Sequence, residues 1–386
     1  MWPNLSDETI RWRAHCKAFA EEVIAPNFAR YDRENSFPLE VHRHAKDWSI
    51  LNIDQPTNLG GQGLSGVSAV VGIETLASVC APCAFTLGFN RGALHPVEAA
   101  GTPEQKERFI GQLVQRQEYA ALCLTEADAP GSNLLGLQTQ AVQTDQGWLI
   151  NGAKVMVGNG GVASQFLVLA QTIVQGQPRG VNFFIVPKGP GVIVGPNTDK
   201  LGFRAVETPE VQFKNAEVDD FHRLGDIGTG TDPMLKTLHF IRVGGAATIL
   251  GIVVGALKDA LAWIEERKVY GGSLSQKSHV QLVLGQIFSK LELTRRMILE
   301  AALLRDDGQP YGHQASIAKL HAAELAIEAT HQVVQLFGWR GIDAEYPIQK
   351  RYRDARQTPI FEGTSETQKL NLFRHLADIY KRDEPL

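Results

Sequence analysis

The spacing of apolar and polar positions divides the chain into three parts. In residues 1–120, apolar side chains recur three and four positions apart, and segments rich in glycine and proline interrupt them at 55–61 and 101–103. This pattern predicts an N-terminal helical domain. Its expected helices cover residues 5–29, 41–51, 66–79 and 103–116.

Short β-rich runs replace the helical pattern in residues 121–230, and turns of glycine, proline, asparagine and aspartate separate them. They predict a middle domain with a small sheet or barrel, with strands near 120–125, 147–150, 165–171, 181–186, 192–194 and 211–213. Residues 231–386 return to long helical patterns, which predict a C-terminal four-helix bundle over 233–268, 276–306, 313–338 and 365–381. The expected fold class is therefore α+β and mainly α.

Composition narrows the classes of function. The chain has 386 residues, 44% hydrophobic and 21% charged, which is typical of a globular protein with more than one core. A net charge of −4 gives no electrostatic reason to expect nucleic acid or an anionic membrane, and four cysteines do not make a disulfide framework. Residues 1–26 lack an apolar signal sequence. The charge-free segment 243–257 is shorter than the roughly 20 residues that span a bilayer. We expect a cytoplasmic protein in which that segment is a buried bundle helix.

One segment near the C-terminus carries a candidate catalytic acid. Glu362 precedes Gly363 and two hydroxyl residues, and a helical pattern follows. Ser365 and Gln368 have the spacing of a capping box, which predicts a helix beginning near Ser365. An acid among apolar residues has a raised pKa and can act as a base near neutral pH. From this segment alone, a surface glutamate in the turn before a helix explains the pattern equally well.

Several short motifs occur in a fixed order along the chain. They are residues 101–106 (GTPEQK), 124–126 (LTE), 131–133 (GSN), 151–154 (NGAK), 200–204 (KLGFR), 266–271 (ERKVYG), 345–347 (EYP), 353–354 (RD) and 362–365 (EGTS). Each motif is weak alone, but their order and spacing are specific. Together they resemble the acyl-CoA dehydrogenase family of flavoproteins over essentially the whole chain.

The resemblance implies a reaction, a cofactor and partners. It implies noncovalent FAD between the β domain and the C-terminal bundle, in a homodimer or homotetramer whose neighbouring subunit contacts part of the FAD. The implied reaction is α,β-dehydrogenation of an acyl thioester of CoA or of an acyl carrier protein. A carboxylate removes the α-proton and flavin N5 accepts the β-hydride. An electron-transfer flavoprotein is a possible further partner.

The resemblance also implies roles for particular residues. Glu362 matches the catalytic base, and its own backbone N–H, with a ribityl hydroxyl of FAD, would bind the thioester carbonyl. Gly363 and Arg242 match substrate-binding positions, and Arg242 would lie near the nucleotide tail of the thioester. The implied cofactor-binding residues are Leu124, Thr125, Ser132, Met156, Gly158, Arg267, Tyr270, Gln335, Gly338 and Thr364. Of these, Arg267 would pair with FAD phosphate across the dimer, and Gln335 and Gly338 would contact the adenosine side.

The chain departs from the family pattern around the flavin. Met156 replaces a tryptophan that shields one flavin face, and Gly158 replaces a threonine whose hydroxyl approaches N5. The loop after Glu126 carries an extra residue within 127–130 and ends in Asn133 rather than aspartate. These changes leave the electron acceptor open and suggest a specialised enzyme, for which we consider an acyl-carrier-protein thioester, including aminoacyl or hydroxyacyl groups.

Other functions and sites compete with this interpretation. An oxidase on the same fold remains open, whereas Glu362 argues against a flavin monooxygenase, since such relatives commonly lack the glutamate. A non-catalytic scaffold is a third possibility. Some relatives place the base on the helix around residue 241, which here is Ile241. Cys80 and Cys83 have CxxC spacing, but without a second ligand pair we expect a structural role and no metal site.

Overall fold

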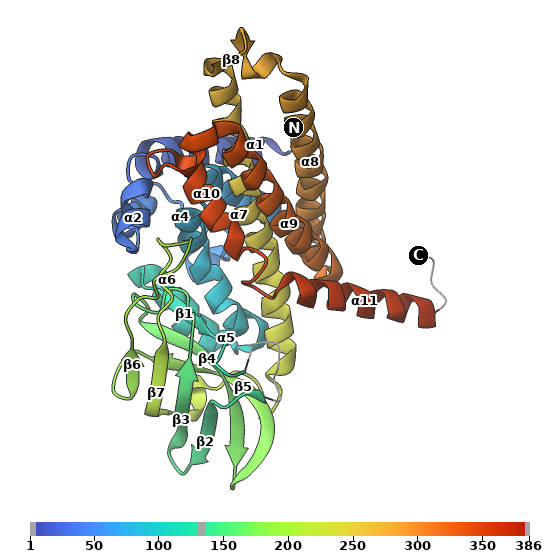
Figure 1. Ribbon diagram of the computed structural model, residues 1–386. Coiled ribbons are helices and arrows are strands. Elements are labelled where there is room, and N and C mark those ends of the chain that lie inside the picture. The colour runs from blue at the N-terminus through green and yellow to red at the C-terminus, as the bar shows by residue number, and fades with distance from the viewer. Residues whose placement is uncertain (1–4, 130–135, 383–386) are drawn as a thin grey trace.

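Helices from both ends of the chain pack together at one end of the molecule, and a mixed β-sheet forms the other end (Figure 1). The computed structural model describes residues 5–129 and 136–382. The mainly helical, three-part architecture expected from the sequence is confirmed. The longest helices, α4 (Gly66–Ala100) and α7 (Thr231–Glu266), run side by side down the middle and connect the two ends (Figure 1).

Most N-terminal helices form where helical spacing predicted them, but the short helix α2 was not expected. Ser6 caps the first helix by accepting a hydrogen bond from the Thr9 backbone N–H, and Thr102 and Gln105 form a capping box further along. The elements before the sheet, besides α4, are α1 (Asp7–Phe19), a π-helical turn (Ala20–Ile24), α2 (Phe28–Glu34), α3 (Leu39–Asp47), a 3₁₀ turn (Thr57–Leu59), α5 (Pro103–Lys106), a second π-helical turn (Glu107–Gly111) and α6 (Gln112–Arg116).

The helix expected over 66–79 is confirmed, because a kink with non-helical angles at Cys80 (φ −148°, ψ 104°) divides α4 into two helical segments. The second segment, which continues to Ala100, was not predicted. Pro82 has no backbone N–H to donate, so it fits the first turn of the second half, just after this kink. Pro82 therefore marks the start of a second helical segment after the kink.

The sheet contains seven strands in the order β1-β4-β2-β3-β7-β6, with β5 paired to β4. The strands are β1 (Ala120–Cys123), β2 (Gln140–Thr144), β3 (Gly147–Lys154), β4 (Gln165–Val174), β5 (Gln177–Pro187), β6 (Val192–Val194) and β7 (Val211–Val218). Strand β4 is parallel to β1 and β2 and antiparallel to β5. Strand β2 escaped prediction because Ala141 and Val142 are its only apolar residues.

Alternating side chains of the central strands build two cores. Phe166 and Phe184 lie in the core on one face of the sheet with Trp148, whereas Leu167 and Phe183 face the helices of the N-terminal region. Because successive strand residues point to opposite faces, the apolar runs in β4 and β5 fill both cores at once. The sheet is therefore fixed against the helices that carry the rest of the site.

The C-terminal region is helical, with a short hairpin at its tip. Its elements after α7 are β8 (Lys268–Val269), β9 (Gly272–Ser273), a 3₁₀ turn (Leu274–Gln276), α8 (Ser278–Asp306), α9 (Gly312–Phe337), a 3₁₀ turn (Gly338–Ile342), α10 (Pro347–Gln357) and α11 (Ser365–Lys381). Helix α10 was not predicted, because its eleven residues are mostly polar and basic. Helix α11 extends sideways from the bundle (Figure 1).

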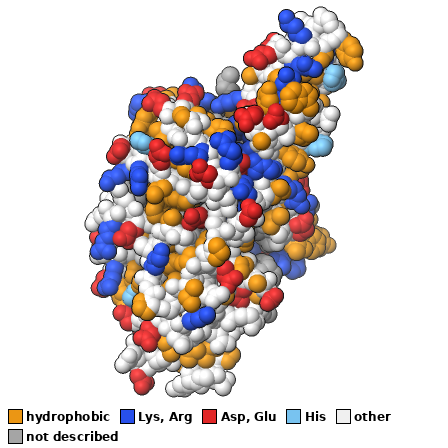
Figure 2. All heavy atoms as spheres, turned by 60° about the vertical axis from the view of Figure 1, so that its left-hand side comes forward, with side chains coloured by type: hydrophobic (Ala, Val, Ile, Leu, Met, Phe, Trp, Pro, Cys, Tyr) orange, Lys and Arg blue, Asp and Glu red, His pale blue; other side chains and the backbone are white. Residues whose placement is uncertain are grey.

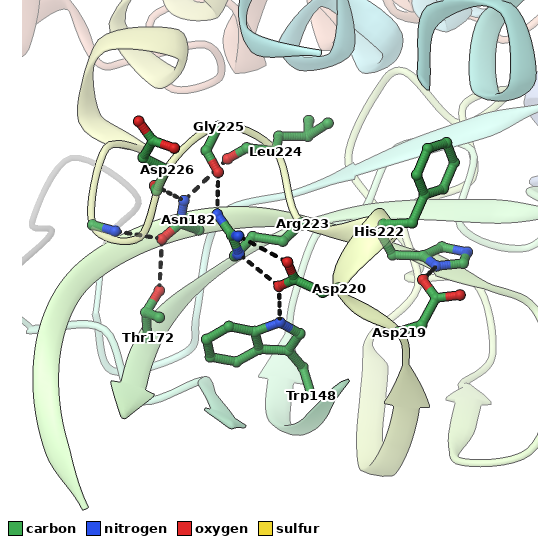
Figure 3. Close-up of polar contacts among 12 residues, drawn as sticks. Trp148, Thr172, Asn182, Asp219, Asp220, His222, Arg223, Leu224, Gly225 and Asp226 are labelled. Atoms are coloured by element: carbon green, nitrogen blue, oxygen red, sulfur yellow. Dashed lines mark hydrogen bonds and ion pairs between the residues drawn. The ribbon is translucent and has the colours of Figure 1, made fainter. Parts of the chain in front are cut away.

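A buried polar network fixes the loop that connects the sheet to α7 (Figure 3). The side-chain oxygen of Asn182 on β5 accepts hydrogen bonds from the Thr172 hydroxyl (2.9 Å) and the Gly228 N–H (2.7 Å). The amide nitrogen of Asn182 donates to the carbonyls of Leu224 (3.0 Å) and Asp226 (2.8 Å). A 3₁₀ turn (Asp220–His222) is anchored beside it, because the Trp148 indole N–H donates to the Asp220 carboxylate. These bonds set where α7 leaves the sheet.

Two helices of the described chain, α4 and α7, are long and apolar enough to cross a membrane by length and composition. In each, 78% of the most apolar 18-residue window is buried inside the protein. Their hydrophobicity is therefore accounted for by mutual packing, and the prediction that residues 243–257 form a buried helix is confirmed. Acidic and basic side chains are interspersed over the face in Figure 2.

Candidate active site

A cavity of about 510 Å³ lies among the edge of the sheet, α4, α7 and the turn before α11. Volumes of this size are typical of sites for small molecules and cofactors. The cavity brings together eight of the residues singled out in the sequence. These are Leu124, Thr125, Met156, Gly158, Arg242, Glu362, Gly363 and Thr364.

Glu362 lies in a strained turn that an aromatic cluster supports. Its φ is 54°, and that of Gly363 is 89°, so two successive residues adopt left-handed conformations. For a residue with a side chain this conformation is unfavourable, and it persists where the surroundings hold it. The preceding Phe361 packs edge-on against Phe203 (5.2 Å between ring centroids) and Phe85 (5.7 Å). Packing of Phe361 among these aromatic rings therefore fixes the direction of the adjacent Glu362 carboxylate.

The carboxylate of Glu362 rests directly on the backbone of α7 at Gly245. A Cβ atom at Gly245 would lie 1.7 Å from Oε2 of Glu362, so only glycine leaves room for the carboxylate. Oε2 is buried and has no hydrogen-bond partner among the described residues. Because a buried oxygen without a partner costs free energy, this atom is available to a ligand in the cavity.

Lys319 on α9 is a residue of the site that the sequence interpretation missed. It is fully buried, and its Nζ donates a 2.7 Å hydrogen bond to the Gly363 carbonyl oxygen. The same carbonyl accepts a 2.9 Å bond from Nε2 of Gln368 on α11. Lys319 is the one lysine, arginine, aspartate or glutamate in the alanine-rich stretch 315–323, and this is a signal that could have identified it. Both donors hold the turn that presents Glu362.

Burial and two nearby cations set the acidity of Glu362. Burial raises the pKa of Glu362 to about 8, and the positive charges of Lys319 and Arg242 act in the opposite direction. Burial also lowers the pKa of Lys319 to about 8 and that of Arg242 to about 10, and the negative charge of Glu362 opposes both shifts. A carboxyl group with a pKa near neutral can both take up and release a proton there.

At the sheet edge, a buried ion pair shapes the turn that follows β1. Nζ of Lys154, at the end of β3, lies 2.9 Å from the Glu126 carboxylate and also donates to the Leu124 carbonyl (3.1 Å). Glu126 accepts further bonds from the backbone N–H groups of Gln138 and Thr139. Two sequence motifs distant along the chain thus meet and hold Leu124 and Thr125 at the cavity wall.

The two departures from the family pattern lie together on the same wall. Met156 has a left-handed φ of 55° and a half-exposed side chain that lines the cavity. A Cβ atom at Gly158 would lie 2.5 Å from the ring of Phe89 on α4, so the space of a larger side chain is taken by Phe89. Threonine at position 158 would therefore require this ring to move.

The predicted start of α11 is confirmed at Ser365, but its cap differs from the prediction. Thr364 is the N-cap, and its hydroxyl accepts a 3.2 Å hydrogen bond from the Thr367 N–H. The expected pairing of Ser365 with Gln368 is wrong, since Gln368 instead donates to the carbonyls of Gly363 and Thr364. Because the Gln368 side chain binds these carbonyls in the Glu362 turn, the helix is capped by the Thr364 hydroxyl alone.

Four of the proposed cofactor residues lie away from this cavity. Arg267 and Tyr270 occupy the end of α7 and the hairpin at the tip of the bundle, and Gln335 and Gly338 occupy the end of α9. All four are exposed, Tyr270 to 99%, and none belongs to the described residues that line the cavity. Ser132 lies outside the described residues.

Comparison with known proteins assigns the family. Models of the acyl-CoA dehydrogenase N-terminal, middle and C-terminal domains match residues 6–117, 121–216 and 228–377. The chain belongs to the acyl-CoA dehydrogenase family. Members of this family are oxidoreductases acting on CH–CH groups, so the resemblance seen in the sequence motifs is confirmed.

Individual members of the acyl-CoA dehydrogenase family are similar to this chain in sequence and in structure. A short-chain specific acyl-CoA dehydrogenase from Clostridium acetobutylicum is 35% identical over 95% of this chain and 97% of its own length. Butyryl-CoA dehydrogenase from Megasphaera elsdenii has a TM-score of 0.92 and 31% identity, over 98% of this chain and all of its own. The prolyl acyl carrier protein oxidase AnaB has a TM-score of 0.91, over 97% of this chain and all of its own. Its 24% identity shows a shared fold alone.

Proposed function

We propose that this protein catalyses FAD-dependent α,β-dehydrogenation of an acyl-CoA thioester, with Glu362 as the base that removes the α-proton. The observation that carries the proposal is the buried Glu362 carboxylate, which has an unpartnered oxygen and a pKa of about 8 and faces a cavity of about 510 Å³. The family of the chain and its short-chain acyl-CoA dehydrogenase relatives support the choice of reaction and of CoA as the carrier.

The residues at the sheet edge fit the ring system of FAD. Leu124 and Met156 offer apolar surface, Thr125 offers an exposed hydroxyl, and Gly158 is buried against the Phe89 ring. Such a wall suits a flat heteroaromatic ring with polar edges. When bound, FAD supplies the acceptor for the two electrons that leave the β-carbon with a hydride.

Glu362 supplies the proton chemistry. The thioester carbonyl acidifies the α-C–H bond, and a base with a pKa near neutral is best matched to removing that proton. Gly245 allows the carboxylate to lie against α7, and Lys319 and Gln368 fix the turn through the Gly363 carbonyl. Because the cavity is largely apolar and closed by helices, water is kept from the carboxylate, which sustains its raised pKa.

Anaerobic titration of the FAD-loaded protein with a panel of acyl-CoA thioesters tests this proposal. We expect thioesters to bleach the flavin absorbance, and we expect Glu362→Gln to bind FAD but to slow bleaching by at least 10³-fold. Full-rate bleaching by Glu362→Gln would mean that another group is the base. Faster bleaching by matched acyl-carrier-protein thioesters would instead assign the carrier-protein alternative.

We further propose a homodimer or homotetramer in which Arg267, Tyr270, Gln335 and Gly338 serve the FAD of a neighbouring subunit. Their exposure at the bundle tip supports this, as they lie outside the cavity of their own chain. Apolar side chains also stand exposed along α8 and on the projecting α11, among them Leu282, Leu293 and Phe373. Exposed apolar groups concentrated on one helical region are typical of interfaces. An electron-transfer flavoprotein is the partner proposed to reoxidise the enzyme.

A further inference from the structure

Two open glycines line the cavity where helices α4 and α7 face each other. The helices are in close contact where a Cβ atom at Gly92 would lie 2.9 Å from Cγ2 of Ile241. In contrast, a Cβ atom at Gly88 on α4 or at Gly244 on α7 would meet a single atom of the described chain within 4 Å, apart from adjacent atoms of its own helix. Gly88 is exposed although its helix lies in the middle of the molecule. Both glycines line the cavity, so the space beside them belongs to it.

The atom that both positions would meet is the Cδ1 methyl of Ile73, which lies 3.9 Å from each Cβ position. Ile73 belongs to the first segment of α4, and the kink at Cys80 separates this segment from the one that carries Gly88. The Ile73 side chain is partly exposed and lines the same cavity. Its methyl group therefore borders the open space at both glycines.

This open space lies next to the proposed base. Gly244 precedes Gly245, whose Cβ position is 1.7 Å from Oε2 of Glu362. An acyl chain held at Glu362 by its thioester group therefore meets Gly244 first and the Ile73 methyl group next. Glycine has no side chain, so the helix backbone leaves room there for the methylene groups of the chain.

The cavity also extends to residues that lie away from the two glycines. Val70, one helical turn before Ile73, and Trp12 on α1 line it, and a Cβ atom at Gly72 would lie 2.4 Å from Nε1 of Trp12. Both side chains present apolar surface, which suits further methylene groups. Neither Trp12 nor Val70 has an atom within 4 Å of the Cβ positions of the open glycines. Ile73 is therefore the residue that lies next to both parts of the cavity.

We propose that Ile73 sets the length of the acyl group that the enzyme accepts. The acyl chain runs from Glu362 past Gly244 and Gly88, and its terminal methyl group ends against the Ile73 side chain. This inference rests on the proposed function, because it places the thioester at Glu362. The substrate class is a linear saturated acyl group short enough to end at Ile73, and a smaller side chain at this position admits longer chains.

Binding of unreactive thioether analogues of acyl-CoA to the FAD-loaded protein measures this limit without turnover. Each methylene group that enters an apolar site tightens Kd about fourfold. In a calorimetric series of linear alkyl chains from two to twelve carbons, we expect this gain to continue up to the length that reaches Ile73 and then to stop. In Ile73→Ala the gain should continue for about two further methylene groups, because isoleucine exceeds alanine by three carbon atoms.

Gly88→Ala moves the same limit in the opposite direction. The added methyl group occupies the open space beside Ile73 and should end the gain at a shorter chain, while alanine favours the helix and so preserves folding. Ile249→Ala is the matched control, because Ile249 is a buried isoleucine of α7 that is not among the described residues lining the cavity. Its chain-length limit should equal that of the wild type.

Two results would overturn the inference. If Kd keeps tightening through the twelve-carbon analogue in the wild type, Ile73 sets no limit. An unchanged limit in Ile73→Ala, or in Gly88→Ala should Ile73→Ala not fold, would assign the limit to another residue. The proposed function is judged separately, by flavin bleaching with a four-carbon acyl-CoA. Normal bleaching beside an unchanged limit would reject this inference alone.

Discussion

At the scale of single residues, the site depends on the Glu362 carboxylate, whose surroundings shift its pKa in opposite directions. Burial raises the pKa of Glu362, while Lys319 and Arg242 lower it, and the balance is about 8. Burial alone would leave the carboxyl protonated at neutral pH and useless as a base. The two cations keep part of the population ionised without forming a hydrogen-bonded pair with Oε2, which stays available.

Lys319→Met should move the pH dependence of dehydrogenation upward. Lys319 lowers the pKa of Glu362, so removing its charge raises that pKa above about 8 and reduces the ionised fraction at pH 7. We expect the rising limb of kcat/KM against pH to shift by about one pH unit, with the largest loss below pH 8. Lys319→Arg keeps the positive charge, so the rising limb of kcat/KM should stay at the same pH. An unchanged limb in Lys319→Met, with FAD still bound, would mean that Lys319 only supports the turn.

At the scale of elements, the site depends on close contact between the Glu362 turn and helix α7. Gly245 has no side chain, which allows the carboxylate to approach the helix backbone. Glycine inside a helix costs roughly 0.5–1 kcal/mol relative to alanine, so this position gives up helix stability for access. At the neighbouring Gly244, an added Cβ atom would make only an ordinary van der Waals contact, 3.9 Å from Cδ1 of Ile73.

Gly245→Ala should therefore separate stability from activity. The added methyl group displaces the Glu362 carboxylate, and we expect kcat/KM to fall about 10²-fold or more, as misplacement by about 1 Å commonly does. The melting temperature should stay level or rise, since alanine favours the helix. Gly244→Ala on the same helix is the matched control and should cost less than tenfold. Equal losses in both variants would show that the Gly245 contact has no special role.

Prediction from sequence succeeded where local pattern decides the structure. The helices of the bundle and most strands followed from periodicity, and the residues carrying the family resemblance located Glu362, Thr125 and Met156 on one cavity. Lys319 could not be found that way, because its role is a hydrogen bond to a carbonyl 44 positions away along the chain. The helical segment of α4 after Cys80 was missed because a proline such as Pro82 can follow a helix end as well as lie in the first turn of a new helix.

At the scale of the whole molecule, the proposed site is divided between two places. Thr125, Met156 and Glu362 line the cavity, whereas Arg267 lies exposed at the tip of the bundle. An arginine suits phosphate through bidentate hydrogen bonds, but at this tip it serves no group of its own cavity. A second copy that brings its tip to the cavity of the first would make one complete site from two subunits.

Mixed dimers of two inactive variants test this arrangement. Glu362→Gln removes the base, and Arg267→Ala should weaken FAD binding by about tenfold or more, because it removes a charged phosphate partner. If Arg267 serves the other subunit, a dimer with one copy of each variant has one cavity with both defects and one with neither. Co-expression with two different tags and isolation of the doubly tagged dimer should then restore about half of the wild-type activity at limiting FAD. Absence of restoration would place Arg267 and Glu362 in the same subunit's site, or Arg267 outside the site altogether. Singly tagged homodimers of each variant provide the baseline, since neither contains an intact cavity.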